Sequence, residues 1–293
     1  MQSQRALKRR IRTVANTGKM AKAMKAISVS KKRRAEQSLE NWTRYCKATA
    51  KALALLFEDP ASETHPMISS RRENEPVILV VVSSDRGLCG AYNSRVLEKA
   101  QQTYEGLGEV SLCTLGKKAG NHFDAQDAYL LMNTEHSGSL DPHLTNRLLE
   151  ILFREYDSQR AQRVLFVSPR YINTMKYTIE VRQLLPLDYE LLDEVATPLP
   201  AVPPDELIVE PNYEETAQEI GKRWVRGLLN LWLSQAFAAE HSARMVAMTD
   251  AFRNCEDLYY NLNLAMNKAR QWSITSEILE VVSGAEALRE DMN

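Results

Sequence analysis

The sequence predicts an α/β protein that joins two very long helices to a Rossmann-like, doubly wound α/β domain. Three observations predict this class: the distribution of prolines, heptad spacing at both ends, and alternating strand-like and helix-like segments between them. All eleven prolines of the 293-residue chain lie between Pro60 and Pro211. Because proline costs about 3 kcal/mol inside a helix, its absence elsewhere favours uninterrupted helices at both ends.

Apolar or small residues near the C-terminus repeat at alternating spacings of three and four: Met245, Met248, Phe252, Cys255, Tyr259, Leu262, Met266 and Ala269. Similar spacing runs from Ile220 to His241, from Leu7 to Ala21 and from Leu39 to Leu56. This heptad seam predicts an antiparallel coiled coil of residues 1–59 with residues 212–293. Two ordinary amphipathic helices in a bundle are the alternative. Helices of these lengths would reach about 85 and 120 Å.

Between two proline-rich linkers, residues 76–195 are expected to form the α/β domain. The run Val77–Ser83 is apolar and β-branched, which is typical of a buried parallel strand. Asp141 and Pro142 supply an N-cap and a first-turn proline for a helix. The other expected elements are a helix at about 92–102, one at 141–156, and strands at 110–115, 129–133, 164–168 and 171–185.

The composition excludes several classes of protein. The apolar run at 77–82 is far shorter than the roughly 18 residues of a transmembrane helix, and the basic N-terminus lacks the apolar core of a secretory signal. The four cysteines stand singly and the five histidines are scattered. We therefore expect a soluble intracellular protein with reduced thiols and no metal or cofactor.

Charge is distributed unevenly along the chain. The first 35 residues hold 12 lysines and arginines and no acid, whereas the whole chain has a net charge of −1. A basic arm on an acidic body suggests a polyanionic partner: nucleic acid, lipid or an acidic protein surface. The run Lys31–Arg34 fits all three, and equally a solvated helix face. No aromatic residue lies in the first 35, so stacking on single-stranded nucleic acid is unsupported.

The loop Asp85–Gly90 follows the first strand and precedes a helix, where a Rossmann fold binds phosphate. Its glycines match neither G-x-G-x-x-G nor the Walker pattern, so a tight turn that requires glycine is favoured over a phosphate site. Cys89 is a weaker candidate nucleophile, because no histidine lies near it in sequence to act as its base. The sequence thus offers no catalytic residues.

Three separated groups of motifs carry a resemblance to a known family. They are RIRTVANT, KM and KAMK within residues 10–25; SDRGLCG followed by YN within residues 84–93; and ARMVAM, NKARQ, IT, EI and EVVSGA within residues 243–285. In this order and on these elements, they resemble the gamma subunit family of F-type ATP synthases. The chain departs from the family pattern at Gly18, Ala21, Ala91, Met266 and Trp272, and therefore looks like a divergent member.

The resemblance implies a non-catalytic central rotor shaft. In this family the terminal helices form a coiled coil inside the ring of three alpha and three beta subunits, and the α/β domain is a foot that binds the epsilon subunit and the c-ring of Fo. Rotation driven by ions at the c-ring then sets the state of each beta site. The chain would be a peripheral membrane protein on the cytoplasmic face, with no segment inserted in the membrane and no nucleic-acid partner.

Matching motifs residue by residue gives candidate contact positions. Arg270, Gln271, Thr275 and Glu277 match positions that hydrogen-bond a loop of beta, and Met24 matches a position near the acidic beta lever. The apolar tail Val281–Leu288 matches the tip that turns in a hydrophobic sleeve. In the foot, the resemblance marks a motif loop with four characteristic residues: Asp85, Arg86, Gly87 and Gly90.

Two rival functions make different predictions. A nucleotide-dependent enzyme built on the α/β domain would bind nucleotide saturably as an isolated chain. A nucleic-acid-binding coiled-coil protein would lose affinity steeply with salt. Neither has a supporting motif, whereas the rotor hypothesis accounts for the proline distribution, the basic arm and the motifs together.

Overall fold

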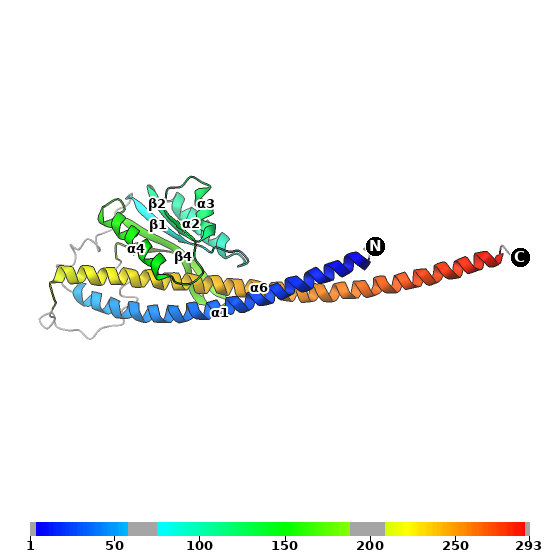
Figure 1. The fold of residues 1–293 in the computed structure, drawn as a ribbon. Coiled ribbons are helices and arrows are strands. Elements are labelled where there is room, and N and C mark those ends of the chain that lie inside the picture. The colour runs from blue at the N-terminus through cyan, green and yellow to red at the C-terminus, as the bar shows by residue number, and fades with distance from the viewer. Residues whose placement is uncertain (1–3, 58–74, 188–208, 291–293) are drawn as a thin grey trace. The chain divides into compact units, whose positions relative to one another are not determined.

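The computed structural model describes residues 4–57, 75–187 and 209–290 (Figure 1). The chain packs as two compact units. The first contains residues up to 27 and those from 246 onward, and the second contains residues 28–245. The domain limits expected from the sequence (1–59, 76–195 and 212–293) follow the secondary structure rather than this packing, and they remain a prediction.

Two long helices lie at the two ends of the chain. Helix α1 spans Gln4–Phe57 and α6 spans Tyr213–Glu290. At the start of α6, the side chain of Asn212 accepts a hydrogen bond from the backbone N–H of Glu215 at 2.9 Å, which satisfies one of the unpaired donors of the first turn. The structure confirms the two predicted long helices. Neither helix contains a proline that would interrupt it.

Within each unit the two helices pair in antiparallel fashion. In the first unit, the side chain of Gln4 donates to the carbonyl of Ala269 at 3.4 Å, while Gly18 faces Cys255. In the second unit, Ser38 and Ser234 share a hydrogen bond of 3.2 Å, and Gly227 faces Cys46. Numbers rise on one helix as they fall on the other, which confirms the predicted antiparallel coiled coil.

The second unit contains a five-stranded sheet in the order β3-β2-β1-β4-β5. Strands β1 to β4 are parallel, and β5 pairs antiparallel with β4 at the edge. This is the doubly wound arrangement that the sequence predicts. The strands are β1 Val77–Val82, β2 Val110–Leu115, β3 Leu130–Thr134, β4 Arg163–Asn173 and β5 Lys176–Leu185.

One predicted strand, 171–185, is wrong as a single element. Residues 171–173 end β4, and the chain reverses before β5 begins at Lys176. The side chain of Asn173 accepts hydrogen bonds from the backbone N–H groups of Met175 and Lys176, each at 2.9 Å. Asparagine commonly closes turns in this way, so Asn173 is a local signal for the turn that divides the predicted strand.

Among the described residues, three helices that lie between the strands in sequence pack on the sheet: α2 Tyr92–Glu105, α3 Lys117–Asp124 and α4 Pro142–Asp157. Helices α2 and α4 were predicted, and the predicted cap of α4 is confirmed, since Asp141 accepts from the N–H of His143 at 2.9 Å. The short α3 was not predicted. Its eight residues include two lysines and a glycine, which give little periodic signal.

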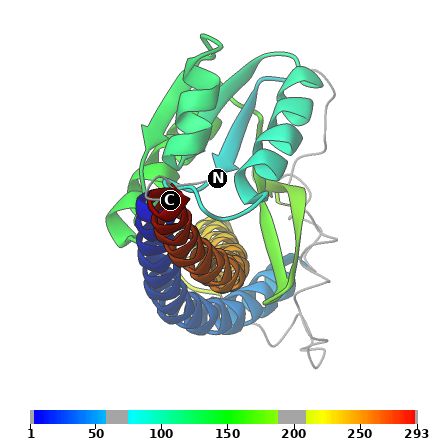
Figure 2. The ribbon, with the colours of Figure 1, turned by 90° about the vertical axis from the view of Figure 1, so that its right-hand side faces the viewer.

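Helices lie on both faces of the sheet (Figures 1 and 2), and an apolar layer is packed on each face. Side chains on one face of β1, such as Leu79, pack against α2 and α3. Side chains on the other face, such as Val80, pack with α4 and with the parts of α1 and α6 that belong to this unit. All six residues of β1 are buried, as expected of a central parallel strand.

Candidate functional site

The loop that follows β1 connects the ends of three strands. The carboxylate of Asp85 accepts the N–H of Lys117, the first residue of α3, at 2.9 Å and the N–H of His136, after β3, at 2.7 Å. The loops after parallel β1, β2 and β3 meet at one edge of the sheet, so a single short carboxylate reaches both neighbours. Asp85 therefore has a structural role at the position where the motif predicts importance.

The turn that ends this loop requires left-handed backbone. Gly90 has φ +58° and Leu88 has φ +62°, a region that glycine adopts without steric cost and other residues rarely occupy. This supports the tight turn expected from the sequence at Gly90. Gly87 has open space where a side chain would begin, so packing does not explain that glycine.

The loop turns carbonyl groups, rather than N–H groups, toward its main side-chain partner. The guanidinium of Arg244 on α6 donates to the carbonyl of Arg86 at 3.1 Å and to that of Gly87 at 3.3 Å. A phosphate cradle needs converging N–H donors. The contacts observed at this loop are with a cation of the C-terminal helix, and they favour the tight structural turn over the phosphate site.

Cys89 is held inside the same loop. It is buried, and the side chain of Asn93 donates to its sulfur at 3.2 Å. The backbone N–H and the hydroxyl of Ser84 both donate to the amide oxygen of Asn93, at 3.1 and 2.9 Å. A buried thiol that accepts a hydrogen bond from an amide has a structural role in packing and is not accessible as a nucleophile.

A buried polar cluster on α6, formed by Glu240, His241 and Arg244, holds the loop in place. Arg244 pairs with Glu240 at 2.8 Å, and its guanidinium lies 3.3 Å from Nδ1 of His241. The other ring nitrogen of His241 lies 2.7 Å from the carbonyl of Gly138. Burial lowers the pKa of His241, because the surroundings disfavour the charged ring. The cluster thus fastens two loops of the sheet edge to one helix.

The basic run on α1 is divided between two roles. Lys31 donates to the carbonyl of Ser137 at 2.7 Å, and Lys32 donates to the hydroxyl of Thr174 at 2.7 Å. Arg33 and Arg34 are exposed. Half of the run therefore fastens α1 to the α/β domain, and only the two arginines face outward.

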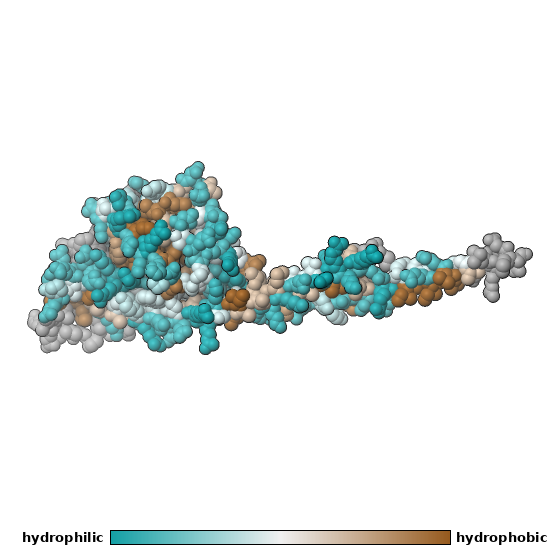
Figure 3. Space-filling model, viewed as in Figure 1, coloured by the Kyte–Doolittle hydropathy of each residue, from teal (hydrophilic) through white to brown (hydrophobic). Residues whose placement is uncertain are grey.

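Four candidate contact residues on α6 (Arg270, Gln271, Thr275 and Glu277) are all exposed. Around them, α6 also exposes large apolar side chains, among them Trp272 at 63% and Ile278 at 57%. Figure 3 shows hydrophobic surface along this part of the helix. The predicted tail Val281–Leu288 is exposed at Val281, whereas the side chain of Leu288 lies outside the described residues.

The fifth candidate, Met24, lies in the same unit but at a different level of the helix pair. It is half-buried. Its neighbour Lys22 lies over the ring of Phe252, with Nζ 5.9 Å from the ring centroid. From Phe252 to Arg270 the helix rises about 27 Å. Met24 and the Arg270 group are therefore separate sites.

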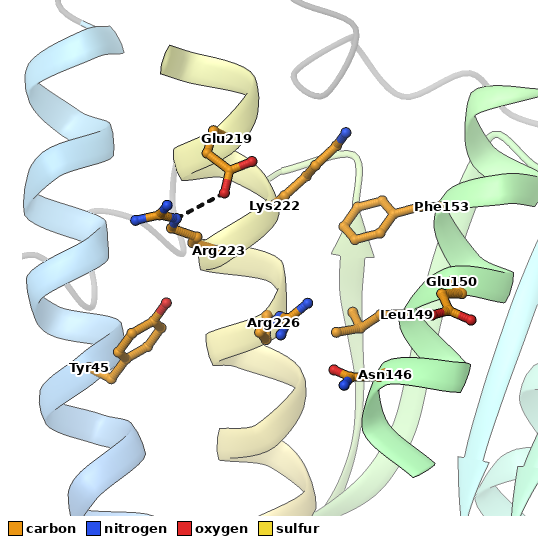
Figure 4. Close-up of a pocket in the computed structure, with 9 residues that line it drawn as sticks. All are labelled: Tyr45, Asn146, Leu149, Glu150, Phe153, Glu219, Lys222, Arg223 and Arg226. Carbon is orange, nitrogen blue, oxygen red and sulfur yellow. Dashed lines mark hydrogen bonds and ion pairs between the residues drawn. The ribbon is translucent and has the colours of Figure 1, made fainter. Parts of the chain in front are cut away.

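A surface hollow of about 650 Å³ opens in the second unit between α1, α4 and α6. Figure 4 shows its lining residues: Tyr45, Asn146, Leu149, Glu150, Phe153, Glu219, Lys222, Arg223 and Arg226. Arg223 pairs with Glu219 at 3.0 Å. The lining has no histidine, cysteine or serine to form a nucleophile–base pair, and none of the predicted site residues lies in it.

Comparisons with known proteins agree with these motifs. A family model described as ATP synthase matches residues 3–288. The ATP synthase gamma chain of Symbiobacterium thermophilum is 31% identical over 291 residues, covering 98% of this chain and 99% of the relative. That of Nitrosospira multiformis is 32% identical over 294 residues, covering 98% and 100%. The chain belongs to the ATP synthase gamma chain family.

Solved structures share the fold. A chain of the Euglena gracilis mitochondrial ATP synthase, determined with OSCP, F1 and the c-ring, matches with a TM-score of 0.68 at 18% identity, covering 99% of this chain and 96% of that chain. A chain from the Tetrahymena thermophila central stalk and c-ring matches with a TM-score of 0.61 at 19% identity, covering 79% and 99%. An identity near 31% to the gamma chains fits a divergent member.

Family membership gives the role of the chain. It is a non-catalytic subunit, the central rotor shaft of F1Fo ATP synthase, which couples rotation of the c-ring to conformational change at the beta catalytic sites. In the part of the chain that the structure describes, no helix is both long and apolar enough to cross a membrane.

The sequence patterns do not predict the residues that fasten the α/β domain to the helices. The sequence patterns place Arg244 in the ARMVAM motif and His241 in the heptad spacing, and they predict no contact with the sheet edge for either residue or for His136. One signal was available. Glu240 and Arg244 are oppositely charged and four residues apart, within a stretch of α6 that is otherwise rich in apolar and small residues.

Proposed function

We propose that α6 from Arg270 onward is the surface on which the beta subunits act. The supporting observation is the exposure of apolar side chains there, from Trp272 to Val282. Isolated apolar residues on a surface are ordinary, but a series of them along one helix marks an interaction site. A ring of subunits around this helix would cover them.

Polar residues in the same segment would give the contact its angular specificity. Arg270, Gln271, Thr275 and Glu277 supply donors and acceptors beside the apolar surface, and Trp272 adds an indole that the family pattern does not have. The hydroxyl of Thr275 already donates to the carbonyl of Gln271 at 3.0 Å. A rotor changes the state of a beta site only if it binds the open and closed forms differently, so these contacts must differ among the three sites.

Met24 and the basic residues of α1 would form a second contact, with an acidic lever of beta. Twelve positive charges within 35 residues suit an acidic protein surface. Exposed ion pairs contribute about 0–1 kcal/mol each, so no single pair would hold the shaft. Weak contacts that re-form during each turn suit rotation.

The α/β domain, residues 76–195, would serve as the foot. In this proposal it binds the epsilon subunit and the c-ring, and the motif loop at Asp85, Arg86, Gly87 and Gly90 acts by fixing this foot to α6. The chain would then lie at the cytoplasmic face of the membrane, held there by its partners, with residues 1–59 and 212–293 as the shaft. No nucleic acid is involved.

Coupled ion pumping tests the contact proposal. The chain would be assembled with the other subunits of the same genome, and ion uptake into vesicles would be measured per ATP hydrolysed. We expect the double variant Arg270→Ala, Gln271→Ala to lower this ratio, because each lost hydrogen bond to a charged group costs about 1.5–3 kcal/mol. Both side chains are exposed, so the melting temperature should not change.

A matched control is Arg253→Ala, which removes the same kind of exposed side chain from the same helix. We expect it to leave the pumping ratio unchanged. A fall in melting temperature for the double variant, or an equal loss of pumping with Arg253→Ala, would contradict the assignment of the contact to Arg270 and Gln271.

A further inference from the structure

Two histidines link loops of the sheet edge to α6 in one continuous series of hydrogen bonds. Nε2 of His136 lies 2.6 Å from the carbonyl of Ser83, and Nδ1 of the same ring accepts the N–H of Gly138 at 3.0 Å. The carbonyl of Gly138 then lies 2.7 Å from Nε2 of His241. Nδ1 of His241 faces Arg244, which holds the loop after β1.

The chemistry of the partners fixes the protonation of both rings. A backbone N–H and a guanidinium are donors only, so Nδ1 of His136 and Nδ1 of His241 must both accept. The carbonyls of Ser83 and Gly138 are acceptors only, so both Nε2 atoms must carry hydrogen. Each imidazole is therefore neutral and makes a hydrogen bond through both nitrogens. A second proton on either ring would set one N–H against another.

Burial, rather than the charges around it, makes protonation of His241 costly. Two cations act on His241: Arg244 on α6, which also contacts its Nδ1 atom, and Lys31 on α1. The carboxylate of Glu240 acts in the opposite direction, but it is paired with Arg244. His136 packs against Phe237 at a centroid distance of 4.9 Å, and its backbone N–H is bound by Asp85.

We propose that His241 is a positioning residue that fastens the α/β domain to α6 while it is neutral, through Gly138 and the ring of His136, and that loosens this connection when its own ring is protonated. The inference rests on the shaft function, because its consequence is mechanical. A foot loosely joined to the shaft would transmit c-ring rotation less efficiently. The chain would thereby lower coupling when the surrounding solution becomes acidic.

The direction of the pH dependence follows from burial. His241 is 2% exposed, and burial lowers its pKa below the ordinary value of about 6.5. The contribution of the neutral ring to stability is therefore complete above about pH 6.5 and is lost as the pH falls through the lower value of the folded protein. Histidine suits such a response, because few other groups titrate in this range.

The test compares wild type with His241→Gln in the assembled enzyme. A glutamine amide can donate to Gly138 and accept from Arg244, but it does not titrate. Hydrogen exchange in segments 84–90 and 135–140 would be measured at several pH values between 7.5 and 5.5, always as the ratio of variant to wild type at one pH. His143→Gln, which changes an exposed histidine of α4, is the control.

We expect equal protection in both proteins at pH 7.5 and, on acidification, a loss of protection in wild type that His241→Gln does not share. Ion pumping per ATP should show the same divergence. Equal protection of wild type and His241→Gln at every pH would overturn the inference, as would a matching effect of His143→Gln. Exchange is read from the loops themselves, so a failure of the proposed beta contacts would leave this test intact.

Discussion

Helices α1 and α6 pair with the same heptad spacing in both units of the chain, but the two units surround α6 differently. In the second unit, α6 is buried on nearly all sides from Trp224 to Ser242, and the α/β domain shares its core. In the first unit, Met248 and Leu262 are the two buried side chains among the described residues of α6, and Leu262 packs against Leu7 and Val14 of α1 in a small cluster. One helix is thus a core element along one stretch and one strand of a coiled coil along the next.

The difference shows what heptad spacing can and cannot indicate. Heptad spacing, in which apolar residues recur every three or four positions, requires only one apolar stripe along the helix, and this stripe is present in both stretches of α6. Apolar residues outside the stripe, such as Leu229 and Leu233, mark the stretch that other elements also cover. Exposed apolar residues of the first unit, such as Tyr260, are consistent with the proposed ring of subunits around it.

The largest expected difference between the units concerns their cores. Trp224→Ala should lower the free energy of unfolding by about 3–5 kcal/mol, because Trp224 is wholly buried in the large core of the second unit. Leu262→Ala should cost about 2 kcal/mol, since the site is nearer solvent and can relax. Urea unfolding of the chain measures both. Equal losses would mean that the two stretches are equally packed.

A smaller difference is expected for polar groups. Asp85→Ala leaves the N–H groups of Lys117 and His136 without their acceptor and should cost about 1–3 kcal/mol. Thr17→Ala removes an exposed hydroxyl that bonds only to its own helix, and should change stability by about 0.5 kcal/mol or less. Thermal unfolding at matched protein concentration compares them. A neutral Asp85→Ala would show that the loop does not depend on this carboxylate.

Substitution of the two glycines in the helix contacts should change stability in opposite directions. Gly18→Ala adds a methyl group at an ordinary distance, 3.4 Å from Cys255, and should stabilise the chain by up to about 1 kcal/mol through helix propensity. At Gly227 the same methyl group would lie 3.0 Å from both Cys46 and Tyr45, and crowding should outweigh that gain by about 1 kcal/mol. If both variants change the melting temperature in the same direction, the contact between α1 and α6 at Gly227 can widen to accept a methyl group.

Much of the fold could be predicted because its signals are local. The missing prolines, the heptad spacing and the apolar run at 77–82 each depend on nearby residues, and each corresponds to an observed element. The short helix α3 and the turn at Asn173 were missed, because eight residues and a two-residue turn carry little periodic pattern. The contact residues from Arg270 to Glu277 came from motif resemblance, and their role stays a prediction.

The sequence by itself determined which segments form helices and strands, where the chain is basic, and which family motifs it carries, since these depend on residue identity and spacing. Only the tertiary structure decided what the motif loop does. Arg244 contacts Gly87 and Arg86, which precede it in the sequence by 157 and 158 positions. His241 and Gly138, which also contact each other, are 103 positions apart. Such pairs form because the sheet and the helix pack together, and the spacing of residues along a chain does not record that packing.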